Sequence, residues 1–217
     1  MFALDFPFFQ TSKSLLLHPS QVSIGYIRGV RKRINPPVQY ALLALSLYGI
    51  FQFFAKDFLN MVAQNNFLSG FSEGFSDYEG SAKTAARSDK MKNAVNWLQS
   101  RNQFFLFLMI PCMGWLSSLF YRKKGYNFAE HLVIAIYAVA FSSLLTVVVG
   151  LLMASIGGEA VARKFTTISM ILPLIGITWI WQQSLKGGII RPILILSLSL
   201  LITGFLATML LMGIIFS

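Results

Sequence analysis

Long runs of apolar residues dominate the chain from residue 38 onward, and short polar segments separate them. A helix that crosses a bilayer needs about 20 mostly apolar residues. Five windows approach or exceed that length, at residues 38–54, 104–120, 129–153, 165–181 and 190–215. The pattern therefore predicts an all-α, polytopic integral membrane protein with about five transmembrane helices.

The first 35 residues follow a different, amphipathic pattern. After Pro19, apolar residues recur at the three-to-four spacing of a helix, while cations gather on another side. Such a helix lies on a membrane surface, and the earlier stretch FPFFQTSKSLLLH is expected to form a second interfacial element. We therefore divide the chain into a basic amphipathic segment, 1–35, and a five-helix membrane domain, 36–217, with an outer loop at 56–102.

Composition supports a membrane environment and excludes an ordinary soluble domain. Of the 217 residues, 55% are hydrophobic and 12% are charged, and twenty are Phe. One soluble core of this size cannot bury that much apolar surface. The formal net charge of +10 would suggest nucleic-acid binding in a soluble protein. Here the cations lie at helix ends and no nucleic-acid-binding motif accompanies them, so we expect no nucleic-acid partner.

Four cations stand just before the first apolar window: Arg28, Arg31, Lys32 and Arg33. Short segments rich in Lys and Arg are retained in the cytoplasm. With a cytoplasmic N-terminus, the inner segments carry ten cations and two acids, and the outer segments eight cations and six acids. The cluster therefore predicts that orientation, with the C-terminus periplasmic or external. It is expected to contact anionic phospholipids or a partner, or to act only as an electrostatic anchor.

Two apolar windows share a short internal sequence similarity. Pro111 with Gly114, and Pro173 with Gly176, stand three residues apart, and each pair is followed by an aromatic residue and a Lys-Gly turn. This suggests two tandem helical hairpins of the same orientation, although common packing needs explain the match equally well. The prolines and glycines are predicted to be helix kinks or gating hinges.

Glu130 and His131 form the sharpest polar feature, at the head of the third window. An ionisable pair at a membrane boundary can relay a proton or hold a substrate. Adjacent residues diverge by about 100° on a helix, however, and a carboxylate near a helix N-terminus is favourable for stability alone. The pair is therefore a candidate functional site with a structural alternative.

Machinery for metal or cofactor chemistry is not visible in the sequence. His18 is the only other histidine, and the single cysteine, Cys112, falls inside an apolar window. We therefore expect no metal site, no cofactor and no catalytic residues, and an enzyme is the less favoured interpretation.

Small residues at close-approach spacing predict helix packing. Gly150 with Ala154, and Gly204 in the last window, would let helix backbones meet. Five helices can satisfy some of these faces internally. At least one face, most plausibly that of the last helix, is expected to meet another integral membrane subunit or a second copy of the chain.

The stretches YIRGVRKRINPPVQYALL and FYRKKGYNFAEHLVIAIYAVAF resemble an uncharacterised bacterial membrane family, domain-of-unknown-function family 3667. The matching positions are Tyr26, Gly29, Arg31, Pro37, Glu130, His131 and Leu132. The resemblance covers about a quarter of the chain and implies a bacterial inner-membrane location. Members often begin with a zinc ribbon, which this sequence lacks. The five-span plan resembles the Yip1-type fold more weakly, and neither resemblance supplies a reaction or a substrate.

Together these features predict a non-catalytic membrane subunit or scaffold of a bacterial inner-membrane complex. The alternative is a small transporter or channel for a small molecule, ion or lipid. A third hypothesis is a membrane-embedded lipid-modifying enzyme that uses Glu130 and His131 as acid and base. A transporter needs polar groups that converge near the bilayer midplane, and the scattered hydroxyl and amide side chains of the windows do not predict such a centre.

Overall fold

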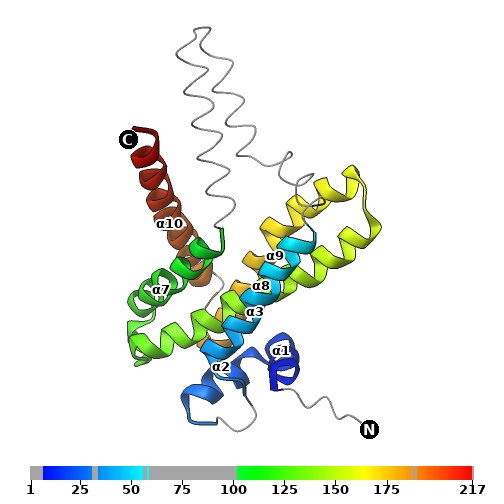
Figure 1. The fold of residues 1–217 in the computed structure, drawn as a ribbon. Coiled ribbons are helices and arrows are strands. Elements are labelled where there is room, and N and C mark those ends of the chain that lie inside the picture. Colours follow the sequence, from blue (N-terminus) through cyan, green and yellow to red (C-terminus); the bar gives the residue numbers. More distant parts are fainter. Residues whose placement is uncertain are drawn as a thin grey trace, which may run out of the picture.

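The structure is a computed structural model that describes residues 7–30, 34–55, 58, 102–186, 188 and 190–216. Regular structure in these residues is entirely helical. The helices are α1 (Pro7–Leu17), α2 (Pro19–Ile27), α3 (Pro37–Phe54), α7 (Asn102–Phe120), the short 3-10 helix η1 (Arg122–Lys124), α8 (Phe128–Ile156), α9 (Glu159–Leu185) and α10 (Ile190–Phe216). Figure 1 shows α3, α8 and α9 grouped together, with α7 and α10 side by side as a second arm.

Three of the helices, α3, α8 and α9, are long and apolar enough to cross a membrane. Shorter apolar stretches lie in α7 and α10, at Leu108–Phe120 and Ile190–Leu206. Helix α9 begins six residues before the predicted window, because Gly157 and Gly158, both with positive φ, set its start rather than the onset of apolar residues. Most of the predicted outer loop, 56–102, lies outside the described residues.

Helix α8 is the hub of the bundle. It packs extensively against α3, α7 and α9, and 61% of its most apolar window is buried, against 28% for α3 and 25% for α9. Small side chains such as Ala135, Ala138 and Ser142 lie buried along it, so neighbouring backbones can approach closely. Helices α3, α7 and α9 are therefore positioned largely by their contacts with α8, whereas α10 packs chiefly against α7.

The predicted kink sites pack against this hub from two sides. Pro111 and Pro173 both lie inside continuous helices. A Cβ added to Gly114 would lie 3.3 Å from the Leu132 backbone, and one added to Gly176 would lie 3.0 Å from the Ser142 hydroxyl. Both glycines thus permit close packing on α8. Helix α10 packs more extensively against α7 than against α9, although the predicted tandem hairpins pair α9 with α10.

Helices α1 and α2, with residues 34–36, form a collar at one end of the bundle, and this name is kept below (Figure 1). Leu15 of α1 and Val22 of α2 are buried in the main hydrophobic core. Parts of the apolar sides of both helices therefore pack on protein, whereas Phe9, Leu16 and Leu17 of α1 stay exposed. That this region lies on a membrane surface stays a prediction. Val30, which follows α2, is also largely exposed, at 58%.

Buried hydrogen bonds fix the collar in place. The Ser23 and Ser184 hydroxyl oxygens are 2.6 Å apart, and the Asn35 backbone N–H donates to the Thr11 hydroxyl at 2.9 Å. The Tyr137 hydroxyl of α8 donates to the Asn35 carbonyl at 2.6 Å. These bonds satisfy polar groups that would otherwise be costly to bury, so the collar is an integral part of the bundle.

Candidate functional site

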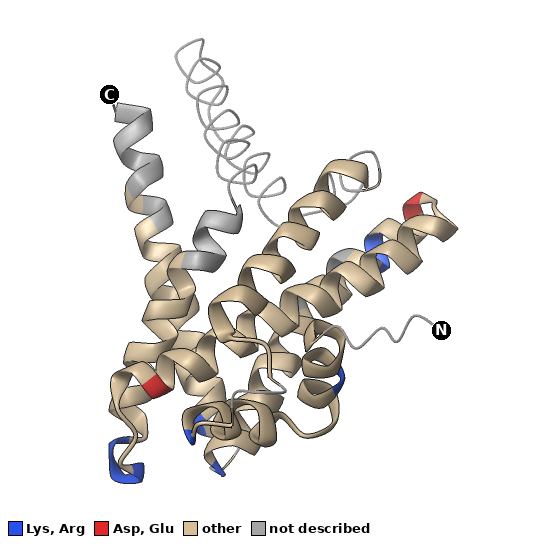
Figure 2. Ribbon diagram, turned by 60° about the horizontal axis from the view of Figure 1, so that its bottom comes forward, with Lys and Arg blue, Asp and Glu red and all other residues tan. Residues whose placement is uncertain are grey.

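Charge separates the two ends of the molecule. The collar end is called the basic end; its described cations are Lys13, Arg28, Arg122, Lys123, Lys124, Lys186 and Arg191. Only Arg163 and Lys164 lie at the opposite end among the described residues, next to Glu159. Figure 2 shows this difference along the ribbon. Of the predicted basic cluster, Arg28 is described, whereas Arg31, Lys32 and Arg33 lie outside the described residues.

Glu130 has a structural role at the start of α8. Its carboxylate accepts a hydrogen bond from the Asn127 backbone N–H at 2.8 Å. This is the reciprocal half of a capping box, and it places a negative charge in the first turn of the helix. The structure therefore supports the stabilising interpretation of Glu130.

His131 lies on another side of α8 and is completely buried. The rings of Tyr121 and Tyr126 surround it, with centroids 6.4 Å and 6.0 Å away. Neither ring nitrogen has a hydrogen-bond partner among the described residues. The two members of the predicted pair therefore do not meet, as the helical repeat indicates.

Sequence reasoning missed the residues that accompany His131. Tyr121 is 1% exposed, and its hydroxyl also has no partner in the described part of the chain. The guanidinium carbon of Arg191 lies 5.7 Å from the centre of the Tyr121 ring, within cation–π range. Burial raises the pKa of Tyr121, and the positive charge of Arg191 partly offsets that effect. An aromatic residue next to a basic turn carries no sequence signal that would have revealed this cluster.

Six buried hydroxyl groups inside the bundle form hydrogen bonds within their own helices. They donate to carbonyls of their own helix three or four residues earlier, at 2.8–3.3 Å; the residues are Ser117, Ser142, Ser143, Thr146, Ser199 and Thr203. Such bonds neutralise a polar side chain within its own helix. Each of these hydroxyls is therefore satisfied within its own helix, and that of Ser142 also lies 3.5 Å from the Pro173 carbonyl of α9.

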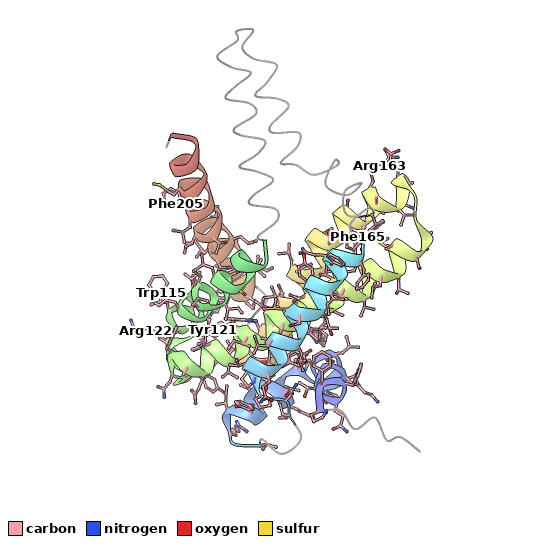
Figure 3. The ribbon with its side chains drawn as sticks, viewed as in Figure 1. Trp115, Tyr121, Arg122, Arg163, Phe165 and Phe205 are labelled. Carbon is pink, nitrogen blue, oxygen red and sulfur yellow. The ribbon has the colours of Figure 1, made fainter. Side chains whose placement is uncertain are left out.

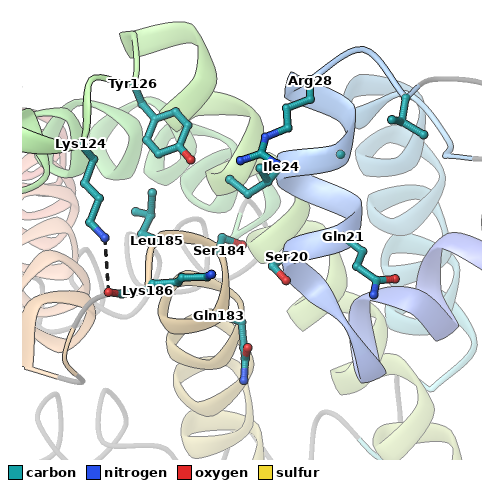
Figure 4. A pocket seen from close by; sticks show the side chains of 12 residues that line it. Ser20, Gln21, Ile24, Arg28, Lys124, Tyr126, Gln183, Ser184, Leu185 and Lys186 are labelled. Carbon is teal, nitrogen blue, oxygen red and sulfur yellow. Dashed lines mark hydrogen bonds between the residues drawn. The ribbon is translucent and has the colours of Figure 1, made fainter.

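A cavity of about 520 Å³ lies at the basic end, between α2, the turn after η1 and the end of α9 (Figure 4). Arg28, Lys124 and Lys186 line it together with Tyr126. The Lys124 ammonium donates to the Lys186 carbonyl at 3.3 Å. The Lys124 and Lys186 positions, which the internal similarity relates, thus lie close together.

Some of the predicted packing residues contact neighbouring helices, and one of them is exposed. Gly150 lies against the Phe51 ring of α3, and Ala154 packs in the same cluster near Phe165 (labelled in Figure 3). Gly204 is exposed, and a Cβ there would meet nothing within 4 Å. Only the last of these positions is available for contact with another molecule.

Groups that could hold a metal are not found among the described residues, where no three His, Cys, Asp or Glu side chains gather. Cys112 is half-buried within α7. Comparisons with known protein families, with curated proteins and with solved structures found no match. The resemblance to domain-of-unknown-function family 3667 and to the Yip1-type fold therefore stays a prediction.

Proposed function

We propose that the chain is a five-span integral membrane protein of a bacterial inner membrane, with its basic end in the cytoplasm. Helices α7 and α10 contain 19 and 27 residues. At 1.5 Å per residue they reach about 28 Å and about 40 Å, close to or beyond a hydrocarbon core of about 30 Å. Their outer side chains are apolar, as Trp115 and Phe205 illustrate in Figure 3, where both point away from the bundle.

Within that membrane the protein acts as a non-catalytic subunit or scaffold. The observation that carries this proposal is the outward, small-residue face of α10. Ser197 and Gly204 are both exposed and lie seven residues apart, about two helical turns, so they share one side of α10. Because lipid provides little hydrophobic drive between helices, small residues that permit backbone contact contribute much of the association. A second membrane helix, from another subunit or a second copy, fits this face.

The alternative hypotheses receive less support from the geometry. A transporter would use convergent polar groups, whereas the buried hydroxyls of α8 and α10 bond within their own helices. A lipid-modifying enzyme that used Glu130 and His131 together would need the two side chains to reach one substrate. Glu130 is instead held in a helix cap, while His131 is buried among aromatic rings.

The test is purification in mild detergent followed by mass spectrometry of every co-purifying protein. We expect Gly204→Leu to reduce partner recovery or self-association severalfold, because the larger side chain separates the helix backbones. Leu201→Ala is the matched control, since Leu201 lies on the same helix and is 68% exposed. A chain that stays a monodisperse monomer in several mild detergents and in native membrane particles contradicts the subunit proposal.

A further inference from the structure

We propose that the cavity at the basic end binds the phosphate group of an anionic phospholipid. The site differs from the sequence-predicted cluster, because two of its three cations, Lys124 and Lys186, come from the turns that follow α7 and α9. The inference rests on the proposed membrane placement and adds a defined ligand to it.

Three cations line this cavity. Figure 4 shows Arg28 and Lys186 directed into the same space from α2 and the end of α9, with Lys124 opposite. No acidic residue is among the described residues that line the cavity. Like charges that converge in this way repel one another, and a bound anion removes that cost.

The partial negative charges of nearby helix C-termini offset only part of the positive charge of the three cations. The C-termini of α2 and α9, at Ile27 and Leu185, both lie at the cavity, and each carries about half a negative charge. The Lys124 ammonium already donates to the Lys186 carbonyl just beyond α9. Three full positive charges against about one negative charge leave an excess of about two, which suits a phosphate group.

Neutral donors complete the site. Tyr126 brings its hydroxyl into the cavity, and Ser20 and Gln21 line the wall formed by α2 (Figure 4). Ser184 is not such a donor: Ser23 donates its proton to the Pro19 carbonyl, so Ser184 donates to Ser23. The Ser184 hydroxyl thus bonds α9 to α2 at the cavity wall, and the Tyr126 hydroxyl is the neutral donor that Figure 4 shows directed into the cavity.

Size and apolar lining favour a lipid over a free ion. The volume of about 520 Å³ falls within the roughly 300–1,000 Å³ typical of small-ligand sites and exceeds the need of one phosphate ion. Ile24 and Leu185 contribute apolar wall beside the cations. The cavity also lies at the ends of membrane-length helices, where lipid headgroups are found.

The experiment is native mass spectrometry of the purified full-length chain titrated with phosphatidylglycerol, and with phosphatidylcholine of the same acyl chains. We expect tighter binding of phosphatidylglycerol, and a loss of about fivefold in its affinity for Lys124→Gln, as for the removal of one cation near a headgroup. Lys123→Gln is the matched control: it removes the same charge from the same turn but does not line the cavity. The affinity of the Lys123→Gln variant for phosphatidylglycerol should stay within twofold of that of the unsubstituted chain. Lys124→Arg, which keeps the charge, should retain binding.

Two results would overturn the inference. Equal losses for Lys123→Gln and Lys124→Gln would mean that general surface charge, and not this cavity, attracts the lipid. Displacement of phosphatidylglycerol by sub-millimolar sodium phosphate, but not by sodium chloride at equal ionic strength, would assign the site to free phosphate. Either result leaves the membrane-subunit proposal standing, whereas a chain that fails to insert into membranes defeats that proposal first.

Discussion

Tyr137 ties the collar to the middle of the chain through a single buried hydrogen bond. Its hydroxyl donates to the Asn35 carbonyl at 2.6 Å, and its ring packs near those of Tyr26 and Tyr40. At this scale the sequence offered helix stabilisation as one of two interpretations of Glu130, because a carboxylate in a first helical turn has a local physical reason. It could not predict the tie to Asn35 or the surroundings of His131, which depend on how distant turns meet.

Replacing Tyr137 with Phe tests this tie. The change keeps the ring but leaves the Asn35 carbonyl without this donor, so we expect about 1–2 kcal/mol less stability. Tyr40→Phe is the matched control: the Tyr40 hydroxyl is 3.1 Å from that of Ser12, which also donates to the Phe8 carbonyl and so keeps a partner. Thermal unfolding in one detergent measures both variants. Equal losses of stability in the two variants would show that the hydrogen bond to Asn35 contributes no more than the contact between Tyr40 and Ser12.

At the scale of the helix, α8 sets the arrangement because other helices approach it at small residues. Gly150 is the tightest of these contacts, since a Cβ there would overlap the ring of Phe51. The sequence predicted that Gly150, Ala154 and Gly204 serve packing and that Gly176 is a kink or hinge, and it predicted the apolar character of the helices. It did not indicate which glycine faces inward, because side-chain partners across helices are not encoded by spacing along one helix.

Alanine substitutions distinguish a glycine that packs against a neighbouring helix from one that faces open space. Gly150→Ala should cost about 1–3 kcal/mol, because the added methyl group forces Phe51 or α3 to move. Gly204→Ala should be neutral or stabilising by up to about 1 kcal/mol, since the space is open and alanine favours a helix. Thermal unfolding of the purified variants gives the comparison, and Phe51→Leu should partly rescue Gly150→Ala. A destabilising Gly204→Ala would contradict the open environment.

The whole molecule is defined by the difference between its ends. The clustered cations before α3 and in η1 let the sequence predict one basic end, because charge at helix termini is a local feature. The cavity formed there by Arg28, Lys124 and Lys186 was not predicted, since its walls come from three separate parts of the chain. The packing of the collar on the bundle escaped prediction for the same reason: an amphipathic helix has the same pattern on lipid and on protein.

Cysteine labelling tests which end faces the cytoplasm. In a Cys112→Ser background, single cysteines at Lys123 and Glu159 occupy exposed positions at opposite ends. We expect a membrane-impermeant maleimide to label the Glu159 position in intact spheroplasts, and the Lys123 position only after permeabilisation. The reverse pattern would invert the proposed topology, and equal labelling of both in intact spheroplasts would argue against a spanning arrangement.

The contact between Ser23 and Ser184 also constrains how the protein is made. These residues lie 161 positions apart, so α2 emerges from the ribosome long before its partner on α9 exists. At about 5–20 residues per second, the delay is roughly 8 to 30 s. During that interval the apolar side of α2 has no protein to cover it, and the adjacent bilayer surface is the nearest apolar environment. The collar would then associate first with the bilayer surface, and it would pack against the protein only when synthesis is nearly complete.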